Sequence, residues 1–87
     1  MQLTEGSVVR STAGHDAGIY GVIVGFERGW PLTADGRIHR LEKPKRKNPK
    51  HLTVLNRTVC LSEIHSNMAL RKLLWPYQYG GMQPESR

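Results

Sequence analysis

The residues most able to do chemistry lie in the segment KPKRKNPKH, residues 43–51. Five cationic side chains fall within eight positions there: Lys43, Lys45, Arg46, Lys47 and Lys50. Cations at this density neutralise successive phosphates of a nucleic acid and release its counterions. Pro44 and Pro49 limit the entropy that such a loop loses when a ligand orders it. A solvated loop that serves solubility is the alternative, but the charge density favours phosphate binding without base readout.

Other polar residues could extend this basic surface. The first strand and the loop after it contribute Arg10, Ser11, Gly14, His15 and Gly18, and the outgoing strand of a later hairpin contributes Arg37, His39 and Arg40. Gly14 and Gly18 would let the loop backbone approach a ligand closely. Tyr20 and His51 complete the candidate RNA-binding set. Tyr20 and Trp30 could each stack a base or pack in the core, and we favour the core for Trp30.

Catalytic and metal-binding roles are not expected. Cys60 and His65 lie five positions apart, but no third group stands out to orient a catalytic pair, and a buried cysteine is the simpler interpretation. The four histidines and one cysteine lack the close paired spacing of zinc ligands. We therefore expect no enzyme activity, no metal and no cofactor.

Composition narrows the class of partner and the compartment. The 87-residue chain has a net charge of +6, which attracts polyanions. A single cysteine excludes an internal disulfide and favours a reducing, cytoplasmic location. The sequence contains no apolar run of about 20 residues, and prolines break its basic run, so we expect no membrane partner.

Short β-branched segments predict the elements that position these residues. We expect strands at Ser7–Ser11, Ile19–Phe26, Trp30–Ala34, Arg37–Leu41 and His51–Leu55. Asp35-Gly36 predicts a two-residue hairpin turn, and Gly21 and Gly25 predict curvature in the second strand. Residues 42–50 should form an exposed loop, Asn56-Arg57 a turn, and Thr58–Leu61 a short extended piece.

A short helix should follow near the C-terminus. With Ser66 or Asn67 as N-cap, Leu70, Leu73 and Leu74 form one apolar stripe, and Pro76 should end the helix after about two turns. The aromatic residues of the segment WPYQY should cover one end of the β scaffold, or else face a partner. The predicted fold is mainly β: a small five-stranded barrel at 1–61, with a helix and tail at 62–87 packed on it as one domain.

The stretch GSVVRSTAGHDAGIYGVIVGFERG resembles a KOW motif, in which a polar loop around an essential glycine joins two strands. The continuation ADGRIHRLEKPKRKNPKHL is similar to small KOW-bearing ribosomal proteins of the large subunit and to compact bacterial KOW RNA-binding proteins. The resemblance covers about residues 6–55 and implies an SH3-like barrel that binds RNA, typically ribosomal RNA.

Two functions remain open at this point. The first is a ribosome-associated module that binds structured RNA and takes part in translation. The second is an SH3-like module that binds a ribosomal or transcription protein through Trp75, Tyr77 and Tyr79 or through an exposed strand edge. RNA binding through salt-sensitive phosphate contacts would distinguish the first from the second.

Overall fold

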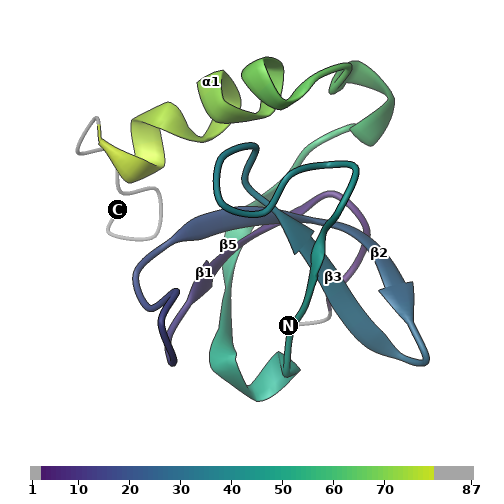
Figure 1. Ribbon diagram of the computed structural model, residues 1–87, viewed down its shortest axis with the longest axis vertical. Helices are drawn as coiled ribbons and strands as arrows, with labels where there is room; N and C mark the ends of the chain where they lie inside the picture. The colour runs from purple at the N-terminus through teal and green to yellow at the C-terminus, as the bar shows by residue number, and fades with distance from the viewer. Residues whose placement is uncertain (1–2, 80–87) are drawn as a thin grey trace.

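A computed structural model describes residues 3–79 and shows a mainly β fold, as the sequence predicts. Five strands form one antiparallel sheet in the order β4-β3-β2-β1-β5 (Figure 1). The strands are β1 (Ser7–Ser11), β2 (Tyr20–Glu27), β3 (Trp30–Ala34), β4 (Lys45–Arg46) and β5 (Leu52–Thr58). A helix, α1 (Asn67–Gln78), packs on the sheet, and the predicted tail at 80–87 lies outside the described residues.

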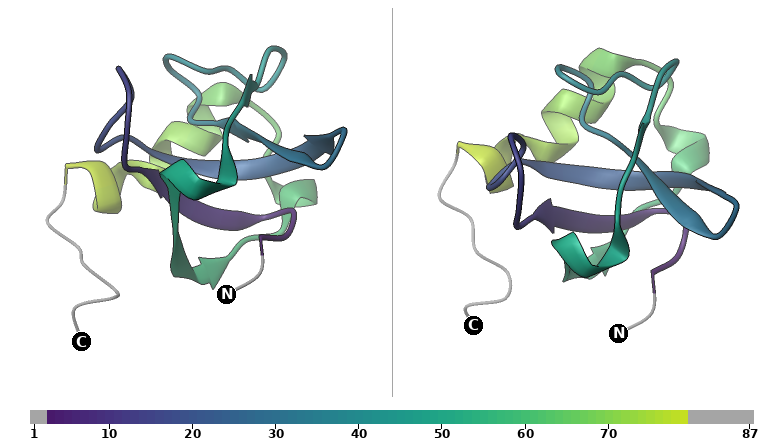
Figure 2. Two further views of the ribbon diagram at one scale, coloured as in Figure 1. Left: turned by 90° about the horizontal axis from the view of Figure 1, so that it is seen from below. Right: turned by 60° about the horizontal axis from the view of Figure 1, so that its bottom comes forward.

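A short connection joins the two edge strands of the barrel-like sheet. β4 and β5 occupy opposite edges, yet only residues 47–51 separate them, and these include the short 3-10 helix η1 (Pro49–His51). The Lys47 N–H donates to the Pro31 carbonyl at 2.9 Å, and the Thr12 N–H donates to the His51 carbonyl at 2.9 Å. The connection is thereby hydrogen-bonded to β3 at one end and to the residue that follows β1 at the other. Figures 1 and 2 show η1 at the end of the molecule opposite α1.

The first three strands agree closely with the prediction, whereas the fourth does not. Residues 37–41 form an irregular loop, and the fourth strand is β4, inside the segment expected to be a loop. The Asp35 carboxylate accepts hydrogen bonds from the backbone N–H groups of Arg37 at 3.1 Å and His39 at 2.8 Å. These bonds fold the chain back on itself locally, so the predicted two-residue hairpin does not form.

The segment after η1 also differs from the prediction. β5 continues to Thr58, so Asn56 and Arg57 lie in a strand instead of a turn. Pairing with β1 extends as far as Ser7 opposite Thr58, which supplies backbone partners along most of this length. A second 3-10 helix, η2 (Leu61–Glu63), then leads towards α1.

The expected helix is present and longer than predicted. The Ser66 side chain caps it by accepting a hydrogen bond from the Ala69 N–H at 3.1 Å. Pro76 lies inside the last turn, so the prediction that Pro76 ends the helix is wrong. Packing favours this last turn, because Tyr77 is buried against the core and its ring lies 5.9 Å from that of Tyr20.

Replacing Ser66 with alanine should lower the free energy of unfolding by about 1 kcal/mol, because an orphan N–H of the first turn loses its partner. Urea unfolding of the two proteins measures this difference. Ser62→Ala, at an exposed position before the helix, provides the control and should change stability by less than about 0.5 kcal/mol. Equal effects of the two substitutions would contradict a capping role.

A hydrophobic cluster lies between the sheet and α1. It includes Val8, Val22 and Leu55 from the strands and Leu70, Leu74 and Tyr77 from the helix. Because these side chains form one cluster, the helix belongs to the same hydrophobic unit as the strands. Tyr20 packs against this cluster.

Two residues expected in the core are exposed instead. Trp30 is 41% exposed, because it begins β3 at the tip of the β2–β3 hairpin, beyond the area that α1 covers. Cys60 is also exposed. Its neighbours Val59 and Leu61 pack against the core, which leaves Cys60 facing outward between them.

Candidate nucleic-acid interface

Four of the five predicted loop cations lie exposed around β4 and η1. They are Lys43, Lys45, Arg46 and Lys50. The Arg46 guanidinium lies 5.6 Å from the centre of the Trp30 ring, which places an exposed aromatic side chain beside these charges. Asn48 supports η1 by accepting a hydrogen bond from the Lys50 N–H at 2.9 Å. We call these four cations together with Trp30 the β4–η1 surface.

The fifth cation, Lys47, points into a polar cluster at one end of the barrel. Its Nζ lies 2.6 Å from Asp16 Oδ2 and 3.4 Å from the Ser11 hydroxyl. His39 Nε2 lies 2.9 Å from the same Asp16 oxygen. The Lys47 and Asp16 side chains are only 12% and 16% exposed. Three residues predicted to bind RNA therefore meet near this carboxylate, which links three loops. They are Ser11, His39 and Lys47.

These contacts change the electrostatics of Asp16. Hydrogen bonds from Lys47 and then from His39 stabilise the carboxylate and lower the pKa of Asp16 from 3.8 to about 2. Asp16 is thus ionised at neutral pH and offsets the charge of Lys47. The sequence analysis did not single out Asp16, and no local pattern identifies its partner, because Lys47 lies 31 positions further along the chain.

The remaining predicted residues do not join the β4–η1 surface as one continuous basic face. Arg37 turns towards α1 and donates a hydrogen bond to the Tyr79 hydroxyl. Arg40 forms an exposed ion pair with Glu42, with atoms 3.8 Å apart. Arg10 is exposed on β1 opposite Tyr20. Gly14 and His15 are exposed in the loop between β1 and β2, Gly18 is half-buried there, and His51 is exposed at the end of η1.

The cations of the β4–η1 surface have no acidic partner among residues 3–79. Within residues 3–79, the ion pairs join Asp16 to His39 and Lys47, and Glu42 to Arg40. No described carboxylate is within 4.0 Å of the side-chain nitrogens of Lys43, Lys45, Arg46 or Lys50. These four side chains can therefore approach phosphate oxygens without first breaking an ion pair to any described residue.

Among the described residues, no three histidine, cysteine or acidic side chains come together as possible metal ligands. None of the helices in that part of the chain is long and apolar enough to cross a bilayer.

Comparisons with known proteins do not assign the chain to a family. The sequence matches no protein-family model, and a search of curated proteins finds no match either. The KOW resemblance therefore stays a prediction.

Proposed function

We propose that the protein is a non-catalytic RNA-binding module that contacts phosphates through the β4–η1 surface. The observation that carries this proposal is the set of four exposed cations without a described acidic partner on β4 and its flanking turns. Such groups supply salt-sensitive binding energy that is largely independent of base sequence. The KOW resemblance supports structured RNA, particularly ribosomal RNA, as the ligand.

Trp30 adds a second mode of contact at the same surface. Its indole is partly exposed, and the nearby Arg46 guanidinium carries charge beside it. An unpaired base can stack on an exposed aromatic ring while a neighbouring cation binds its phosphate. We therefore propose that the module prefers RNA that presents a loop or bulge next to a helix.

The experiment is a titration of the full chain with a labelled RNA stem-loop at several salt concentrations. With four phosphate contacts, log affinity should fall against log salt with a slope of about −3. The double variant Lys45→Ala/Lys50→Ala should reduce the magnitude of this slope by about 2. Arg71→Gln/Lys72→Gln, which also removes two positive charges but on α1, serves as the matched control and should keep the slope of the parent.

Equal losses of affinity in the two double variants would mean that net charge alone attracts RNA, and would overturn the assignment to the β4–η1 surface. Absence of binding at low salt would overturn RNA binding itself. Circular dichroism of each variant ensures that the compared proteins are folded.

A further inference from the structure

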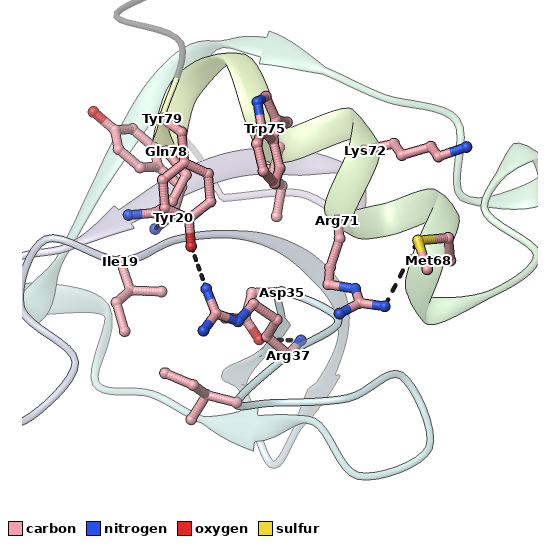
Figure 3. A pocket seen from close by; sticks show the side chains of 12 residues that line it. Ile19, Tyr20, Asp35, Arg37, Met68, Arg71, Lys72, Trp75, Gln78 and Tyr79 are labelled. Carbon is pink, nitrogen blue, oxygen red and sulfur yellow. Dashed lines mark hydrogen bonds between the residues drawn. The ribbon is translucent and has the colours of Figure 1, made fainter.

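A groove lies between α1 and the loop at 35–39 (Figure 3). Its volume is about 660 Å³. Ile19, Tyr20 and Leu74 contribute apolar surface, and Trp75 and Arg71 project from the helix towards Arg37 of the loop. This volume falls within the range of about 300–1,000 Å³ typical of ligand-binding clefts.

The groove gathers much of the exposed apolar surface of the described chain. Large hydrophobic residues that are exposed and line it are Ile38, Met68, Trp75 and Tyr79. The most exposed of these is Trp75, at 59%. Elsewhere in the described chain, only Phe26 and Trp30 are exposed side chains of this kind. Contiguous exposed apolar surface rimmed by polar groups marks interaction sites in soluble proteins.

The charges around the groove are mainly positive. Arg37, Arg71 and Lys72 line it, and Asp35 is the one acidic residue among the lining residues. The Asp35 carboxylate is already engaged by two backbone N–H groups of its own loop. In contrast, Arg71 Nη2 donates only to the weakly accepting Met68 Sδ at 3.6 Å, and its Nε atom is buried without a hydrogen-bond partner within the described chain. An incoming carboxylate would give this guanidinium a charged acceptor in place of the thioether sulfur.

The walls of the groove are joined by direct contacts. The Asn67 side chain at the start of α1 accepts a hydrogen bond from the Leu41 N–H at 2.8 Å. Gly36 packs so closely on α1 that a Cβ atom there would lie 2.4 Å from the Asn67 carbonyl oxygen. Arg37 bonds to Tyr79 at the other end of the helix. A ligand would therefore meet a largely preformed site, which reduces the entropy lost on binding.

We propose that this groove binds a short segment of a partner protein in which a large apolar side chain stands next to an aspartate or glutamate. The apolar residue would pack among Ile38, Leu74 and Trp75, and the carboxylate would pair with Arg71. Charge complementarity selects an acidic segment over a basic one. The apolar lining favours a peptide over an RNA backbone, whose closely spaced phosphates would be poorly solvated against Met68 and Ile38.

The position of the groove leaves room for both ligands to bind at once. Since α1 and η1 lie at opposite ends of the molecule, one molecule can hold RNA at the β4–η1 surface and a protein segment at the groove (Figure 1). The groove proposal does not require that RNA binding be correct.

The test is a selection of ligands for the full-chain protein from a random 12-residue peptide library displayed on phage. We expect enriched peptides to share an aromatic or aliphatic residue next to an acidic one. A synthetic copy of the most enriched peptide should shift the amide resonances of residues 37–38 and 68–75. Its affinity should fall at least tenfold in Arg71→Gln/Lys72→Gln and change less than twofold in Lys45→Ala/Lys50→Ala.

Three results of the peptide selection and its binding measurements would overturn the proposal, and a fourth comes from competition with RNA. They are failure to enrich any shared sequence, enrichment of peptides without an acidic residue, and equal affinity of the selected peptide for the parent protein and the Arg71→Gln/Lys72→Gln variant. Displacement of the peptide by an equimolar RNA stem-loop would assign the groove to RNA and also overturn it. A folding defect in the double variant is bypassed by Trp75→Ala, which removes exposed surface and should weaken the peptide at least fivefold.

Discussion

Replacing Gly36 with alanine is expected to lower the free energy of unfolding by about 3 kcal/mol, the sum of backbone strain and a steric clash. Gly36 has a φ of +83°, a conformation that side chains with a Cβ atom rarely adopt. The added Cβ would also lie 2.4 Å from the Asn67 carbonyl oxygen and 3.0 Å from Arg71 Cγ. The loop would have to move away from α1 to relieve this contact.

Gly14→Ala separates the two contributions to the Gly36 effect. Gly14 has a similar φ of +81°, but a Cβ there would meet no atom within 4 Å. We therefore expect a loss of only about 1 kcal/mol, which reports backbone strain alone. Urea unfolding measures both variants. A Gly36→Ala loss no larger than that of Gly14→Ala would show that the loop is not tightly packed on α1, and would weaken the case for a preformed groove.

Asp16→Asn is expected to destabilise the protein by about 3 kcal/mol at neutral pH, because it leaves the Lys47 ammonium in a poorly solvated position without its counter-charge. The same carboxylate also binds His39, so three loops lose a common acceptor. In Asp16→Asn/Lys47→Met the uncompensated cation is removed as well. We expect this double variant to regain about half of the lost stability.

The pH dependence of unfolding provides a second measurement on Asp16. Folding lowers the pKa of Asp16 from 3.8 to about 2, so the folded state binds this proton more weakly than the unfolded state. The stabilisation is therefore complete above about pH 4 and is lost as pH falls towards 2. The stability difference between the parent and Asp16→Asn should shrink over that interval. A difference that stays constant down to pH 2 would contradict a charged Asp16–Lys47 pair.

The Asp16 pair also affects how the basic segment is interpreted. Adjacent lysines and arginines at 43–50 look equivalent as a charge run, yet Lys47 is paired internally whereas Lys45 and Lys50 are exposed. Variants that replace the whole run would mix a stability effect with a binding effect, so Lys47 should be left unchanged in tests of RNA affinity.

Local patterns in the sequence were sufficient for the β1, β2 and β3 strands and for the start of α1. β-branched side chains are concentrated in β1 and β2, turn residues flank β3, and Ser66 stands at a capping position, so the information lies within a few residues of each element. The excess of positive charge and the exposure of Lys45, Arg46 and Lys50 also follow from composition, because unpaired cations are costly to bury.

Long-range contacts decided the rest. Residues 37–41 form a loop instead of a strand because Asp35 binds its backbone and Gly36 packs on α1. The lysine that is neutralised is Lys47, because its partner carboxylate lies 31 positions away in the sequence. The groove exists only because the helix and this loop lie against each other. The sequence by itself determined the type of fold and the sign of its charge, through local periodicity and composition. Only the tertiary structure decided which charged and apolar side chains stayed free to bind, because pairing and burial depend on neighbours far along the chain.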